Sequence, residues 1–86
     1  MNHDAIVQDL LRFISTELLD GDADGLDGET ALIELGIISS MSIVLLSAHI
    51  EDTWGVAVPQ RDLTVANLGT LNRMADLVLR LHAGRG

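Results

Sequence analysis

The 86-residue sequence has no cysteine, lysine or tyrosine, and its only proline is Pro59. Without cysteine, the chain can form neither a disulfide framework nor a thiolate metal site. Phe13 and Trp54 are the only aromatic residues, so the core must be aliphatic, which suits packed helices better than a β-sandwich. At 86 residues the chain is large enough for a modest core but too small for a core and a deep catalytic cleft, and with 48% hydrophobic residues it can fold. We therefore expect one domain over residues 1–86.

Positive charge is also scarce. Five arginines stand against thirteen acidic residues, which gives a formal net charge of −8. Such a chain is repelled by nucleic acid and anionic membranes, because phosphate binding relies on cationic side chains, and it should attract basic partners. The N-terminal segment MNHDAIVQDL has acids where a signal peptide needs a positive region, and no apolar run approaches membrane-spanning length. We expect a soluble, cytoplasmic protein.

Apolar residues recur with helical spacing in three segments. Residues 3–19 form one predicted helix, with Asn2 as its N-cap. A second helix starts near Ser39 and Ser40 and runs to about Trp54, where Gly55 stops it. The third follows its cap, Thr70, and carries a stripe made of Leu71, Met74, Ala75, Val78 and Leu81. Thr64 can cap one short turn over residues 65–68. The fold class is all-α: a small four-helix bundle of three main helices and one short helix.

Two connections separate these helices. Residues 20–38 begin with turn formers and have no helical period, and a connection this long in a small domain is usually functional or mobile. We expect Leu32, Leu35 and Ile37 to anchor its second half to the core. Residues 56–58 must be extended, because a residue before proline avoids the helical region, so they form a connector.

The segment Leu35-Gly36-Ile37-Ile38-Ser39-Ser40-Met41 resembles the modification site of acyl and peptidyl carrier proteins. The other features of that family follow in order: an apolar helix, the stop Glu51-Asp52-Thr53-Trp54-Gly55, an apolar step from Val56 to Pro59, and a final Leu/Val-rich helix. The resemblance covers nearly the whole chain. It implies a carrier that is not an enzyme, with 4'-phosphopantetheine attached covalently to Ser40 by a phosphopantetheinyl transferase.

Ser39 and Met41 flank this attachment residue. A phosphate ester on a serine at a helix start lies at the positive end of the helix dipole, which favours an anion. Taken alone, Ser39 or Ser40 could be only an N-cap, and the family usually has Asp where Ser39 stands. An unmodified, carrier-like interaction module is therefore the alternative hypothesis.

The second helix should place Ile43, Leu46, Ser47, Ile50 and Trp54 toward the core. Its opposite face carries the candidate partner-binding residues Met41, Leu45, Ala48, His49 and Asp52, unless the 20–38 loop covers Met41 and Leu45. This apolar face resembles free-standing peptidyl carriers of pyrrole natural products, a branch of nonribosomal peptide and antibiotic biosynthesis. In those, an adenylating ligase loads proline as a thioester, a flavin dehydrogenase oxidises it to pyrrolyl, and a halogenase or acyltransferase can follow. A polyketide, fatty-acid, D-alanyl or other aminoacyl carrier is the runner-up.

Two other chemistries are disfavoured. Asp20, Asp22 and Asp24 match the first half of an EF-hand loop, but Ala31 stands at the position of the closing bidentate acid, so we expect no dedicated metal site. His49 is nine residues beyond Ser40 on one helix, roughly 13 Å along its axis, which is too far for a hydrolase pair. We expect His49 to be a surface residue.

Overall fold

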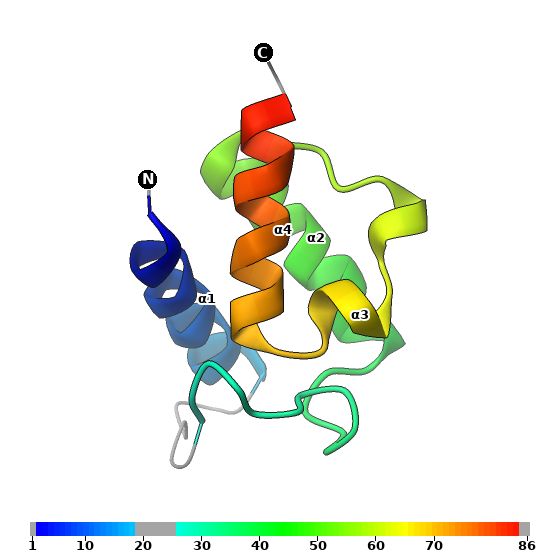
Figure 1. The fold of residues 1–86 in the computed structure, drawn as a ribbon. Coiled ribbons are helices and arrows are strands. Elements are labelled where there is room, and N and C mark those ends of the chain that lie inside the picture. Colours follow the sequence, from blue (N-terminus) through cyan, green and yellow to red (C-terminus); the bar gives the residue numbers. More distant parts are fainter. Residues whose placement is uncertain (1, 19–25, 85–86) are drawn as a thin grey trace.

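The computed structural model describes residues 2–18 and 26–84 (Figure 1). These residues form α1 (His3–Leu18), α2 (Ser40–Trp54), a 3-10 turn η1 (Gln60–Asp62), α3 (Val65–Leu68) and α4 (Leu71–Gly84). No strand occurs in the described residues, and the all-α bundle with one short helix is confirmed. The turn η1 was not predicted. None of the described helices has the length and apolar character needed to cross a membrane.

Side-chain caps set the helix starts. The N–H of Ala5 donates to Asn2 Oδ1 at 2.8 Å, which begins α1. Thr64 Oγ1 accepts from the N–H of Asn67 at 3.3 Å, and Thr70 Oγ1 accepts from the N–H of Arg73 at 3.1 Å. Each cap satisfies a backbone N–H group that has no partner within its helix, and all three agree with the prediction from sequence.

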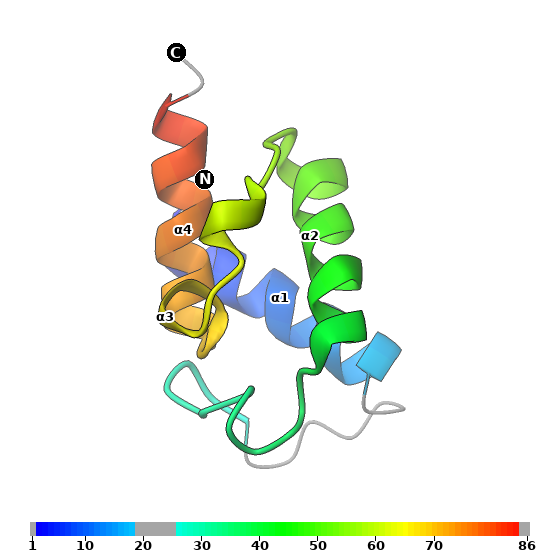
Figure 2. The ribbon, with the colours of Figure 1, turned by 90° about the vertical axis from the view of Figure 1, so that its right-hand side faces the viewer.

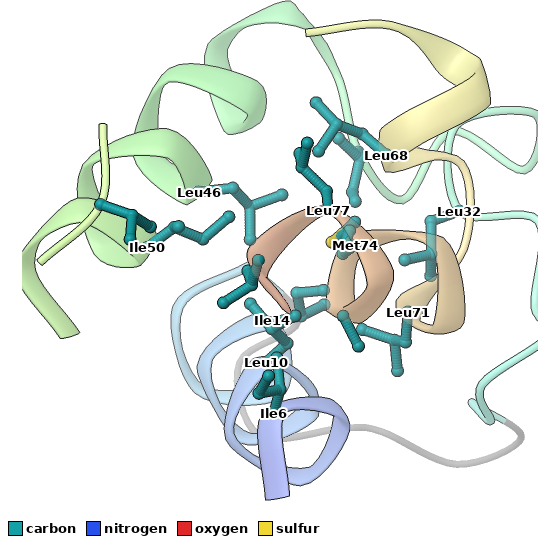
Figure 3. Packing of buried hydrophobic residues seen from close by; sticks show 14 residues of the cluster. Ile6, Leu10, Ile14, Leu32, Leu46, Ile50, Leu68, Leu71, Met74 and Leu77 are labelled. Carbon is teal, nitrogen blue, oxygen red and sulfur yellow. The ribbon is translucent and has the colours of Figure 1, made fainter. Parts of the chain in front are cut away.

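Helix α4 is the centre of the bundle, because α1, α2 and α3 all pack against it. Figure 3 shows Leu10 and Ile14 of α1 near α4, with Leu46 of α2 approaching from another side. The predicted α4 stripe is buried from Leu71 to Val78, and Leu81 is half-buried. Leu77 is also fully buried although it lies outside that stripe, since α4 has neighbours on more than one face.

The segment before α2 makes one helix-like turn that ends at Gly36. The N–H of Ile37 donates to the carbonyl of Leu32 at 2.9 Å, and the N–H of Gly36 donates to that of Ile33 at 3.1 Å. These two bonds, with φ of 76° at Gly36, form a Schellman stop. Leu32 is buried and Ile37 is half-buried, as predicted. The prediction for Leu35 is wrong: it is 67% exposed, because it occupies the outward side of this turn.

Candidate functional site

Ser40 is exposed and is the first residue of α2. The preceding residue, Ser39, is the N-cap: its backbone is extended, its Oγ accepts from the N–H of Ser42 at 3.5 Å, and its carbonyl accepts from the N–H of Ile43 at 3.0 Å. The N–H groups of Ser40 and Met41 have no hydrogen-bond partner among the residues described. The Ser40 hydroxyl is thus displayed in solvent beside free backbone donors, while Ser39 supplies the cap.

The Schellman stop at Gly36 positions this serine pair. It reverses the chain after one turn, so that Ile38 enters the core, where it is 2% exposed. Ser39 and Ser40 follow at once and are exposed. Figure 2 shows this segment leading directly into α2. The Leu-Gly element of the motif therefore has a structural role: it ends a turn and delivers the serine to the helix start.

An anionic group esterified to Ser40 would fit this site. The hydroxyl is exposed, and the N-terminus of α2 carries a partial positive charge. No acidic residue occurs in the first turn of α2, so nothing there opposes a phosphate. These residues fit the phosphopantetheine group that the motif implies.

Exposed apolar side chains surround the start of α2. Met41 is 78% exposed and Leu45 is 50% exposed, so the described part of the preceding loop does not cover them. Val44, which is 64% exposed, extends this apolar surface along α2, and Val65 at the start of α3 is 50% exposed. Sequence reasoning missed both valines. Val44 follows from helical spacing, because it lies three residues beyond Met41, but the exposure of Val65 depends on the fold.

The core-facing and outward-facing sides of α2 are arranged as predicted, with one exception, His49. Leu46 and Ile50 are buried, while Ala48 and Asp52 are exposed. His49 lies at the surface only in part: its side chain is 21% exposed and faces α1, and it lines the hollows between the two helices. His49 Nε2 donates to Asp9 Oδ2 at 2.7 Å, and its ring stacks on Phe13 with a centroid separation of 4.1 Å.

The described residues give no support to a metal site or a hydrolase pair, the two chemistries that the sequence disfavours. Asp20, Asp22 and Asp24 lie outside the described residues, and so does Leu19, the predicted last residue of the first helix. Within the described residues, no group of three or more His, Cys, Asp or Glu side chains could hold a metal. His49 and Ser40 lie nine residues apart on α2, and the partner of His49 is Asp9 rather than a serine.

The chain is similar to known proteins in family, sequence and fold. The family model described as "Phosphopantetheine attachment site" matches residues 7–78, which include all of α2 and the turn before it. The "Probable acyl carrier protein PigG" of Serratia sp. (strain ATCC 39006) is 38% identical over 74 residues, covering 86% of this chain and 85% of that protein. A solved structure described as "Crystal structure of FAD-dependent dehydrogenase" contains a chain that is 41% identical and superposes with a TM-score of 0.76. That match covers 81% of this chain and 99% of the other.

Proposed function

This chain belongs to the family of acyl and peptidyl carrier proteins that hold 4'-phosphopantetheine, and from that premise we propose that Ser40 is its attachment point and a prolyl or pyrrolyl group its cargo. Members of this family are not enzymes. They are substrates of a phosphopantetheinyl transferase and of biosynthetic enzymes that act on the cargo. When bound, the arm holds an acyl or aminoacyl group on its terminal thiol as a thioester.

The residues of the chain have three roles in this proposal. The Ser40 hydroxyl supplies the nucleophilic oxygen that the transferase joins to the arm. The first turn of α2 stabilises the resulting phosphodiester through its dipole and unpaired N–H groups. The exposed apolar side chains of Met41, Val44 and Leu45 offer partner enzymes a docking surface next to the attachment point. Tethering then raises the effective concentration of the cargo at each enzyme, rather than lowering a chemical barrier.

One observation carries the choice of cargo. The matched chain in the dehydrogenase structure is about 70 residues long, since 81% of 86 residues is about 70 and they cover 99% of it. A chain of that size is too small to form a flavin-binding dehydrogenase by itself. We infer that it is a carrier bound to the enzyme for which that structure is described. A relative at 41% identity in such a complex supports a flavin dehydrogenase as a partner of this chain and an oxidisable aminoacyl group as its cargo.

The cargo can be tested on the loaded protein. The holo-protein is incubated with proline, ATP and an adenylating ligase of a pyrrole pathway, and then with the matching flavin dehydrogenase and oxygen. We expect intact-mass spectra to show addition of one prolyl group, followed by loss of four hydrogens as flavin accepts the electrons and passes them to oxygen. A Ser40→Ala protein is the control and should show neither change. Failure of the holo-protein to accept proline, or to lose hydrogen afterwards, would exclude this cargo.

The second candidate is a carrier of acyl groups. The relative PigG bears the description of an acyl carrier protein, which favours a fatty-acid or polyketide cargo. This candidate predicts no prolyl loading in that assay. It predicts instead that an acyltransferase moves a malonyl group from malonyl-coenzyme A to the thiol of the arm, with release of coenzyme A. The match over residues 7–78 and the exposure of Ser40 weigh against an unmodified interaction module.

A further inference from the structure

A groove separates the C-terminal half of α1 from the middle of α2. It has a volume of about 440 Å³, and we call it the α1–α2 groove; its lining residues are Phe13, Glu17, Leu45, Ala48, His49 and Asp52. A second hollow of about 270 Å³ continues from it along α1 and shares Phe13, Glu17 and His49. Figure 2 shows α1 passing beside α2. Neither the attachment residue Ser40 nor the start of α2 belongs to this groove.

The floor of the groove is a fixed aromatic surface. The rings of Phe13 and His49 are stacked at 4.1 Å with an interplanar angle of 22°, and Trp54 meets His49 edge-on at 5.9 Å. The hydrogen bond of His49 to Asp9 holds the imidazole in this orientation. Leu45 and Ala48 complete an apolar floor, so a side chain placed here would contact both the aromatic pair and aliphatic groups.

The rim of the groove is acidic and uncompensated. Glu17 on α1 and Asp52 on α2 are exposed, and neither carboxylate has a hydrogen-bond or ion-pair partner among residues 2–18 and 26–84. Arg12, which lines the adjoining hollow, is paired with Asp9 at 3.0 Å. An apolar aromatic floor between two unpaired carboxylates matches a side chain that is flat, partly apolar and positively charged.

We propose that the α1–α2 groove receives an arginine side chain from the enzyme that acts on the cargo, which makes α1 part of the docking surface. A guanidinium can stack on an outer face of the Phe13–His49 ring pair while its N–H groups reach Glu17 and Asp52. Lysine fits less well, because a compact ammonium offers neither the plane nor the forked donors. The chain's net charge of −8 favours such a basic partner.

The groove is also placed for an enzyme that binds the arm. This inference rests on the proposed carrier function. Leu45 belongs both to the groove and to the apolar surface beside Ser40, so the two regions form one continuous face. Asp52 is twelve residues beyond Ser40, roughly 18 Å along the helix axis. An enzyme can therefore hold the groove while its active site takes up the arm.

Two measurements test this proposal. In the first, the 15N-labelled chain is titrated with Nα-acetyl-arginine amide, and amide shifts are followed by NMR. This needs neither the arm nor an enzyme. We expect shifts concentrated at Phe13, Glu17, Ala48 and Asp52, and we expect them to disappear in the double variant Glu17→Gln/Asp52→Asn. A control variant, Asp4→Asn/Asp76→Asn, also loses two negative charges, but at exposed positions away from the groove. It should retain the shifts.

In the second measurement, holo-proteins that the adenylating ligase has loaded with proline are compared as substrates of the flavin dehydrogenase. The groove variant should have a KM about tenfold higher than the control variant, a change in the range seen when a charged contact is removed at an interface. Both variants should still gain phosphopantetheine on Ser40, which separates a failure of the groove from a failure of the carrier function. Absence of localised shifts, or a KM within twofold of the control, would overturn the proposal.

Discussion

Ser39 caps α2 with a neutral hydroxyl at a position where carrier proteins usually have aspartate. Aspartate and serine are similar N-caps, but a carboxylate also interacts favourably with the helix dipole, by about 0.3–1 kcal/mol at low salt. We expect Ser39→Asp to raise the stability of the fold slightly and to increase kcat/KM of the transferase, because the usual acid is restored beside Ser40. Urea unfolding and a modification time course measure the two effects. Equal or slower modification of the variant would show that the missing acid has no part in it.

Gly36 has φ of 76°, a region that residues with a Cβ atom rarely adopt. No atom lies within 4 Å of a Cβ built there, so substitution costs conformational energy and causes no clash. We expect Gly36→Ala to destabilise the fold by about 1 kcal/mol. Gly84→Ala is the matched control, since Gly84 also has open space but is helical. Equal unfolding midpoints for the two variants would show that the Schellman stop contributes little.

At the scale of elements, the contact between α1 and α2 depends on His49. Asp9 and His49 are 23% and 21% exposed, and their hydrogen bond joins residues forty positions apart. We expect His49→Ala to lower the free energy of unfolding by about 1–2 kcal/mol, through loss of this bond and of the stacking on Phe13. Arg12→Ala, which removes an exposed partner of Asp9, should cost less than about 0.5 kcal/mol. Urea denaturation of both variants is the measurement, and equal losses would contradict this assignment.

The helices themselves could be predicted from local signals. Asn2, Thr64 and Thr70 are side-chain caps, and the spacing of Leu71, Met74 and Val78 defines the buried stripe of α4. Tertiary contacts could not be predicted in this way. Helical spacing alone places His49 on the outer face of α2. Its side chain is nevertheless only partly exposed, because it contacts Asp9 and Phe13, which are remote in sequence.

In the candidate site, too, the features set by local sequence could be predicted and those set by tertiary contacts could not. The position of Ser40 at the start of α2 follows from the motif and from Ser39 as N-cap. The exposure of Leu35 does not follow from its apolar character. It depends on the turn that ends at Gly36, and the sequence of this segment has no helical period from which that turn could be predicted. The α1–α2 groove could not be predicted from the sequence either. Its lining residues come from two helices, and no local sequence pattern encodes how those helices pack.

For the whole molecule, the dominant feature is unbalanced negative charge. Thirteen acidic residues and five arginines leave a net charge of −8, and repulsion among these charges opposes the compact state. Added salt screens this repulsion, since the Debye length falls from about 30 Å at 0.01 M to about 8 Å at 0.15 M. We therefore expect Tm to rise between these two concentrations of sodium chloride. A scan in which Tm stays constant or falls would show that self-repulsion is not a significant term.

The central claim is that the exposed hydroxyl of Ser40 accepts phosphopantetheine, and intact-mass spectrometry tests it most directly. The wild-type chain, Ser40→Ala and Ser39→Ala are each incubated with coenzyme A, magnesium and a phosphopantetheinyl transferase. The account predicts that wild type and Ser39→Ala gain the mass of one phosphopantetheine and that Ser40→Ala gains none. No gain by the wild type, or a gain that persists in Ser40→Ala, would contradict it.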